Sequence, residues 1–176
     1  MPDNPADKPD TGPVWMGTDD ALGDHDAVGV ADLIASGEIS AAEAVDAAIE
    51  RAERAEPLIA AFATTDFDRA RRRAGGPVEG RFGGLPTAIK DQTAVAGLPL
   101  GFGSQTLADA EPSATSSPIT EIFEAVGTIS LGTTTLPEFG LTSSSDFHHG
   151  PPTHNPRNRD HIAGGSSSGA AALVAA

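Results

Sequence analysis

The 176-residue sequence has no cysteine, no long hydrophobic run and few basic residues. Without cysteine there is no disulfide framework, no thiol nucleophile and no thiolate-ligated metal. No stretch approaches the roughly 18 consecutive apolar residues of a membrane-spanning helix. Eleven Lys and Arg stand against 25 Asp and Glu, a formal net charge of -14, which disfavours contact with nucleic-acid phosphates or anionic membranes. These absences favour a protein without a nucleic-acid or membrane partner.

The N-terminus also lacks the basic start and apolar centre of a secretion signal, so the sequence predicts a cytoplasmic protein. Residues 1–24 are rich in proline, aspartate and glycine, and we expect them to form a disordered acidic tail. The remaining residues, 25–176, have room for one domain of ordinary size.

Helical patterns alternate with short apolar runs along this domain. The predicted helices cover residues 26–37, 40–57, 66–73, 117–126 and 170–176, and the predicted strands cover 58–64, 85–89 and 128–132. Ser40 and Glu43 match a capping box, Gly37 and Gly127 are typical of helix ends, and Pro57 is expected to end the second helix. A helix lies between the last two strands, so we expect these strands to run parallel in an α/β sheet.

Lysine is scarce in this chain, and Lys8 and Lys90 are the only two. Lys90 ends a predicted apolar strand, and a lysine delivered to a site by a rigid element can lose its proton when it is desolvated. To act as a base near pH 7 its pKa must fall from about 10.4 by roughly 3 units, a cost of about 4 kcal/mol. The alternative is a lysine that pairs with Asp91 or is solvated at the strand end.

Residues 164–169 (GGSSSG) run straight into an alanine-rich helix former. The glycines permit a sharp turn, and the unpaired N–H groups of the helix start can hold negative charge. Such a loop is suited to presenting a hydroxyl to a substrate. The alternatives are a flexible linker, a capped helix start, or an anion-binding loop, although the lysine that P-loops place directly after the glycine is missing.

Residues 141–163 show no periodicity and carry four of the five histidines, His148, His149, His154 and His161. Their spacings fit no standard metal-ligand pattern, and no carboxylate or cysteine completes one. We therefore interpret them as solvated loop residues, and we expect neither a metal nor another cofactor.

Three segments together resemble the amidase signature family. Residues 84–91 (GLPTAIKD) resemble its lysine segment, residues 131–139 (LGTTTLPEF) resemble its LGKTNLPEF segment, and residues 155–172 resemble the signature itself. Order and spacing agree from about residue 24 onward, which is far more specific than any one segment. The resemblance implies an α/β fold, the N-terminal portion of the amidase signature fold, with a mixed central β-sheet covered by helices.

The resemblance also implies a chemistry, the hydrolysis of a small-molecule carboxylic amide to an acid plus ammonia or an amine through a Ser–cisSer–Lys triad. Lys90 takes the position of the base. Ser166 takes the position of the middle serine, whose preceding peptide bond is cis in the family. Gly140 falls where the family lines its acyl pocket, and Ser167 is carried over as a second substrate-binding position.

The family's nucleophile lies in a second glycine-serine loop further along the chain, and the sequence ends at Ala176 before it. Residues 25–176 are therefore expected to be an incomplete domain, truncated before the nucleophile loop and inactive as an amidase on its own. The alternative is a non-catalytic remnant, or a half that needs a partner chain. A homodimer and a missing C-terminal portion are the two partners left open.

Overall fold

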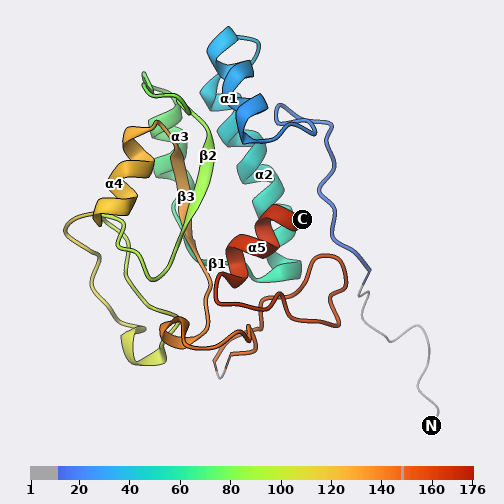
Figure 1. Ribbon diagram of the computed structural model, residues 1–176, viewed down its shortest axis with the longest axis vertical. Helices are drawn as coiled ribbons and strands as arrows, with labels where there is room; N and C mark the ends of the chain where they lie inside the picture. The colour runs from blue at the N-terminus through green and yellow to red at the C-terminus, as the bar shows by residue number, and fades with distance from the viewer. Residues whose placement is uncertain (1–11, 148) are drawn as a thin grey trace.

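A small mixed sheet lies at the centre of the protein, whose computed structural model describes residues 12–147 and 149–176 (Figure 1). The strands are β1 (Phe62–Thr65), β2 (Pro86–Lys90) and β3 (Ile129–Thr134), in the order β1-β3-β2. The central strand, β3, runs antiparallel to β1 and parallel to β2. The mixed α/β architecture expected from the sequence is confirmed.

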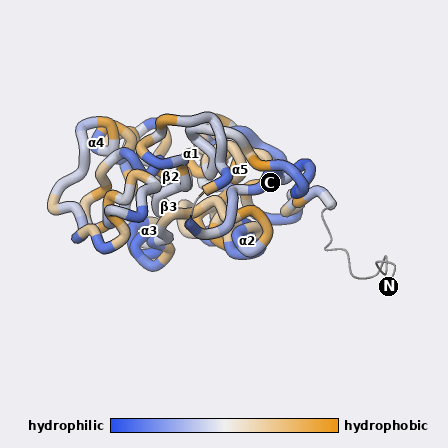
Figure 2. The backbone as a smooth tube through the Cα atoms, turned by 90° about the horizontal axis from the view of Figure 1, so that it is seen from below, coloured by the Kyte–Doolittle hydropathy of each residue, from blue (hydrophilic) through white to orange (hydrophobic). Residues whose placement is uncertain are grey.

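Helices cover this sheet. They are α1 (Ala27–Ser36), α2 (Ala41–Ile59), α3 (Phe67–Ala74), α4 (Pro118–Ala125) and α5 (Ser168–Ala175), with short 3₁₀ turns η2 (Gln105–Leu107) and η3 (Glu138–Gly140). In two perpendicular views, α2 and α5 lie on one side of β2 and β3, and α4 lies on the other (Figures 1 and 2). The predicted crossover is also confirmed, because α4 lies between the parallel strands β2 and β3 in the chain.

Local signals fix the helix ends. The Asp26 side chain accepts the Gly29 N–H and begins α1, and Gly37, at φ 77°, ends it in the left-handed conformation. Ser40 and Glu43 form the predicted capping box, with each side chain accepting a backbone N–H from the other residue. These caps satisfy N–H groups that would otherwise lack partners.

Pro57 does not end α2, contrary to the prediction, and the helix continues to Ile59. A proline removes one N–H from a helix but leaves later residues free to continue it. Ile59 is fully buried among Val14, Ala61 and Ala172. The Glu56 side chain then accepts the N–H groups beyond the helix end. Burial of the last turn therefore outweighs the local cost of Pro57.

The main core cluster joins α2, α3 and β3. Its buried members are Val45, Ile49, Ala70, Ala74, Ile129 and Leu131. The α3 tube is mostly hydrophilic in Figure 2; its buried residues are the small alanines Ala70 and Ala74, and the partly buried Phe67 packs against the same core. Small residues let α3 approach the sheet closely while its arginines stay in solvent.

Residues 12–24, predicted to belong to a disordered tail, instead run along α2 and the end of α5 (Figure 1). Val14 is buried and its N–H donates to Pro156 O at 2.7 Å. Asp20 accepts two hydrogen bonds of 2.6 Å from Arg51. We call residues 12–24 the N-terminal strap. Residues 1–11, the rest of the predicted tail, lie outside the described residues.

Within the described ranges, no helix combines the length and the apolar character needed to cross a bilayer.

Candidate active site

The end of β2 and the loop before α5 bring Lys90 and Ser166 into contact across 76 residues of sequence. Lys90 Nζ donates to Ser166 Oγ at 2.8 Å. Lys90 is positioned by its backbone pairing with Thr134 of β3, and Ser166 by the packing of α5 on β2 and β3. The peptide bond between Gly165 and Ser166 is cis. The structure thus brings together the two residues that the sequence singled out.

Lys90 is partly withdrawn from solvent, and this desolvation lowers the pKa of its ammonium group below its ordinary value. The alternative that Lys90 pairs with Asp91 is wrong. Successive strand side chains point to opposite faces, and the Asp91 carboxylate accepts the Gly101 N–H at 3.1 Å instead. Burial raises the pKa of Asp91. Among the described residues Lys90 therefore has a hydroxyl partner and no carboxylate partner, so no ion pair offsets the desolvation that lowers its pKa.

This setting predicts how stability depends on pH. The pKa of Lys90 is lowered from 10.5, so between the lowered value and 10.5 the folded chain binds fewer protons than the unfolded chain, and stability rises with pH. The stability lost by burying the charged Lys90 is greatest below its pKa in the folded chain, and none is lost above 10.5. Urea unfolding of the 176-residue chain across this window should show the rise, and Lys90→Met should remove it. An identical pH slope in the two proteins would contradict the lowered pKa.

Gly140 lies beside this pair. Its φ is +68°, and a Cβ placed on it would lie 3.9 Å from Ser166 Cβ and 2.9 Å from Gln92 Oε1. Ser167 is the residue before α5, where its exposed side chain makes no capping hydrogen bond. Both residues that were carried over as substrate-binding positions thus lie next to Ser166, Gly140 in space and Ser167 in sequence.

The histidines of residues 141–163 do not form a metal-binding cluster where the structure describes them. No three His, Asp or Glu side chains gather closely enough to hold a metal ion in the described part of the chain. His154 instead makes a 2.9 Å hydrogen bond through Nδ1 with Arg159 O. His148 lies outside the described residues.

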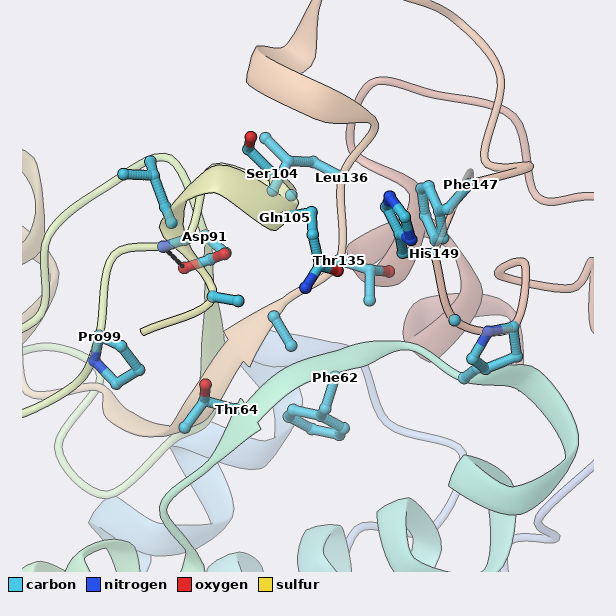
Figure 3. A pocket seen from close by; sticks show the side chains of 18 of the residues that line it. Phe62, Thr64, Asp91, Pro99, Ser104, Gln105, Thr135, Leu136, Phe147 and His149 are labelled. Carbon is cyan, nitrogen blue, oxygen red and sulfur yellow. Dashed lines mark hydrogen bonds between the residues drawn. The ribbon is translucent and has the colours of Figure 1, made fainter. Parts of the chain in front are cut away.

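A separate cavity of about 370 Å³ opens between β1, η2 and the loop that carries Phe147 and His149 (Figure 3). The Asp91 carboxylate, Ser104 and Leu136 line it, but neither Lys90 nor Ser166 does. This cavity lies on the Asp91 side of the strand. Sequence reasoning considered Asp91 only as a possible partner of Lys90 and gave no role to Ser104, and the neighbouring Glu138 entered only as a member of the family-like segment 131–139.

Residues 43–176 match the sequence model of the family described as Amidase. The chain belongs to the amidase family. It is 46% identical over 162 residues to the AmiC protein of Mycobacterium tuberculosis strain H37Rv, covering 90% of this chain and 34% of that protein. It is 38% identical over 158 residues to a glutamyl-tRNA(Gln) amidotransferase component of Salinispora tropica, covering 85% and 32%.

Solved structures agree with this assignment. A bacterial aryl acylamidase belonging to the amidase signature enzymes superposes with a TM-score of 0.78 at 34% identity, covering 85% of this chain and 33% of that one. The amidase chain described here thus spans about a third of the length of the curated relatives it matches. It corresponds to the N-terminal part of the amidase signature fold.

Proposed function

We propose that the native protein containing these 176 residues hydrolyses a carboxylic amide C–N bond, with Lys90 as the base and Ser166 as the hydroxyl that relays the proton. The observation that carries this proposal is the 2.8 Å hydrogen bond between Lys90 Nζ and Ser166 Oγ. A lysine whose pKa is lowered by desolvation loses its proton more readily, and once neutral it can accept a proton from a hydroxyl at that distance.

In the proposed reaction, the neutral Lys90 amine accepts the Ser166 proton while Ser166 accepts the proton of a nucleophilic hydroxyl. That hydroxyl oxygen bonds to the amide carbonyl carbon. The C–N bond then breaks, and the nitrogen leaves with the proton that Lys90 returns through Ser166. Water attacks the resulting ester, releases the acid and restores the hydroxyl. By the family resemblance the nucleophilic serine belongs to a further glycine-serine loop beyond Ala176.

Gly140 and Ser167 are the proposed substrate-binding positions. A side chain at Gly140 would project toward Ser166 and Gln92, so the glycine leaves room beside the relay serine for an acyl group. Ser167 presents an exposed hydroxyl next to it. The relatives carry different names, among them an aryl acylamidase and a 6-aminohexanoate cyclic dimer hydrolase, and the proposal therefore stays with small-molecule amides as a class.

The decisive test begins with the intact mass of the native gene product and a read through the end of its gene. Amide hydrolysis is then compared between the native product, Ser166→Ala and the control Ser143→Ala, whose side chain is exposed. Removing the relay should lower kcat/KM by about 10³-fold, and the control should retain activity. Full activity of Ser166→Ala would overturn the proposal.

The same assay applied to the 176-residue chain tests where the nucleophile lies. We expect no hydrolysis, because the nucleophile and its oxyanion hole are not assigned to any residue of this chain. Hydrolysis by this chain that Lys90→Ala abolishes would show that the nucleophile lies within it. A native product that ends at Ala176 would direct the search to a partner chain that completes the site.

A further inference from the structure

The segment 101–104 is fixed at one end to the residue that follows Lys90. The Phe102 N–H donates to Asp91 O at 2.9 Å, and the Gly101 N–H donates to the Asp91 carboxylate at 3.1 Å (dashed in Figure 3). Asp91 is only 4% exposed, so these bonds are shielded from water. The segment therefore moves with the end of β2, the strand that carries Lys90.

At its other end, the same segment is bound to the turn η3. Ser104 Oγ donates to Glu138 Oε1 at 2.5 Å, and the Phe139 N–H donates to Phe102 O at 2.8 Å. The rings of Phe102 and Phe139 lie 6.1 Å apart. Gly103 packs so closely on Leu136 O that a side chain there would overlap it. Segment 101–104 and η3 thus form one packed unit.

These contacts close a ring around the candidate site. η3 ends at Gly140, and a Cβ placed on Gly140 would lie 3.9 Å from Ser166 Cβ and 2.9 Å from Gln92 Oε1, so this glycine faces both side chains. Ser166 in turn accepts the hydrogen bond from Lys90. The path from Lys90 through Asp91, segment 101–104, η3 and Ser166 therefore returns to Lys90. Among the contacts of this ring, the bond between Ser104 and Glu138 is the one that joins a buried hydroxyl to the ionisable side chain of an exposed residue.

We propose that Glu138 and Ser104 are positioning residues, whose hydrogen bond holds η3 so that Gly140 lies against Ser166 of the Lys90–Ser166 pair. The expected effect on amide hydrolysis rests on the proposed function, but the expected effect on the positions of Gly140 and Lys90 does not. A hydroxyl–carboxylate bond of this length is charge-assisted and stronger than a neutral one.

The first test is an NMR measurement on the 176-residue chain, whose two lysines give only two side-chain signals. Lys90→Met identifies the Lys90 ¹³Cε signal. We expect Glu138→Ala to shift both the Lys90 titration and the Gly140 amide resonance. Ser104→Ala removes the bond but keeps the charge, and should reproduce these shifts. Glu138→Gln removes the charge but keeps an oxygen acceptor, and should leave both signals near their wild-type positions.

The control is Glu121→Ala, which removes an exposed carboxylate from α4 and should change neither signal. The variant Glu138→Ala/Ser104→Ala should shift the signals no further than Ser104→Ala alone, because Ser104→Ala already removes the bond to Glu138 together with the hydrogen bonds of Ser104 Oγ to Thr106. A folded Ser104→Ala chain with wild-type Lys90 titration and a wild-type Gly140 resonance overturns the proposal. If Glu138→Ala does not fold, the Lys90 titration and the Gly140 resonance are compared between Ser104→Ala, which lacks the bond, and Glu138→Gln, which keeps an acceptor.

In the native gene product, misplacing the relay should lower kcat by between about tenfold and a hundredfold for Glu138→Ala and Ser104→Ala, with KM within about twofold. Glu138→Gln should restore kcat. A merely structural role would lower the thermal midpoint and the active fraction without moving the Lys90 titration. If Lys90→Met stays active while the NMR shifts appear, the proposed function fails and the positioning stands.

Discussion

Replacing Lys90 by arginine is expected to abolish amide hydrolysis by the native protein as completely as replacing it by methionine. Arginine keeps the positive charge and nearly the same reach, and it can still donate to Ser166. Its pKa lies above about 12, so it is never deprotonated in a protein and cannot accept a proton. Loss of a positioned base is worth about 10²- to 10⁴-fold in rate, and we expect a loss near the upper end for both variants.

The measurement is kcat/KM for Lys90→Arg, Lys90→Met and Lys8→Arg, the last altering the only other lysine of the chain. Lys8→Arg should retain wild-type activity. If Lys90→Arg keeps more than about a tenth of the activity, well above the range expected for loss of a base, then Lys90 acts by its charge alone. The proton relay would then be wrong, even if Lys90→Met is inactive.

Gly169→Ala is expected to destabilise the chain by about 3 kcal/mol, the upper end for overpacking a close contact. Gly169 lies in the first turn of α5 and is buried. A Cβ there would overlap Ala61 O and approach Thr135 N to 2.7 Å. Both obstacles are backbone atoms beside the sheet, so no side chain can rotate away. The loop that carries Ser166 would have to move with α5.

Urea unfolding of the 176-residue chain measures this effect, with Gly76→Ala as the matched control. Gly76 is exposed, and a Cβ there meets nothing nearer than Arg73 O at 3.8 Å. The control should be neutral or stabilising by a few tenths of a kcal/mol, because alanine restricts the unfolded chain. A Gly169→Ala chain within about 0.5 kcal/mol of the wild type, the range of ordinary surface substitutions, would show that α5 packs more loosely than described.

Sequence reasoning succeeded where the signal is local. The capping box of Ser40 and Glu43 and the helix end at Gly37 each depend on residues within one helical turn, and they were predicted correctly. The strand that delivers Lys90 was found from its short apolar run. The pairing of Lys90 with Ser166 came from the order of family-like segments, because nothing local to either residue indicates the other.

Predictions failed where tertiary contacts decide. Thr133 and Thr134 lie beyond the predicted strand 128–132, yet both are buried in β3 because strands pair with them on both sides. Pro57 reads as a helix end, yet the burial of Ile59 continues the helix. The bond between Ser104 and Glu138 spans 34 residues, and neither residue type signals its partner. Such links depend on the assembled sheet rather than on any short stretch of sequence.

The N-terminal strap has a consequence for synthesis on the ribosome. Some of its partners are distant residues, since the Val14 N–H donates to Pro156 O and the Met16 N–H donates to Ala176 O. The strap and its α2 partner Arg51 emerge early, but the part of the covered surface that Pro156 and α5 provide is translated much later. Contacts so distant in sequence form slowly, and exposed apolar groups in the interval invite aggregation. In nascent chains, Val14 and Ile59 should therefore stay exposed and accessible to chaperones until α5 has left the exit tunnel.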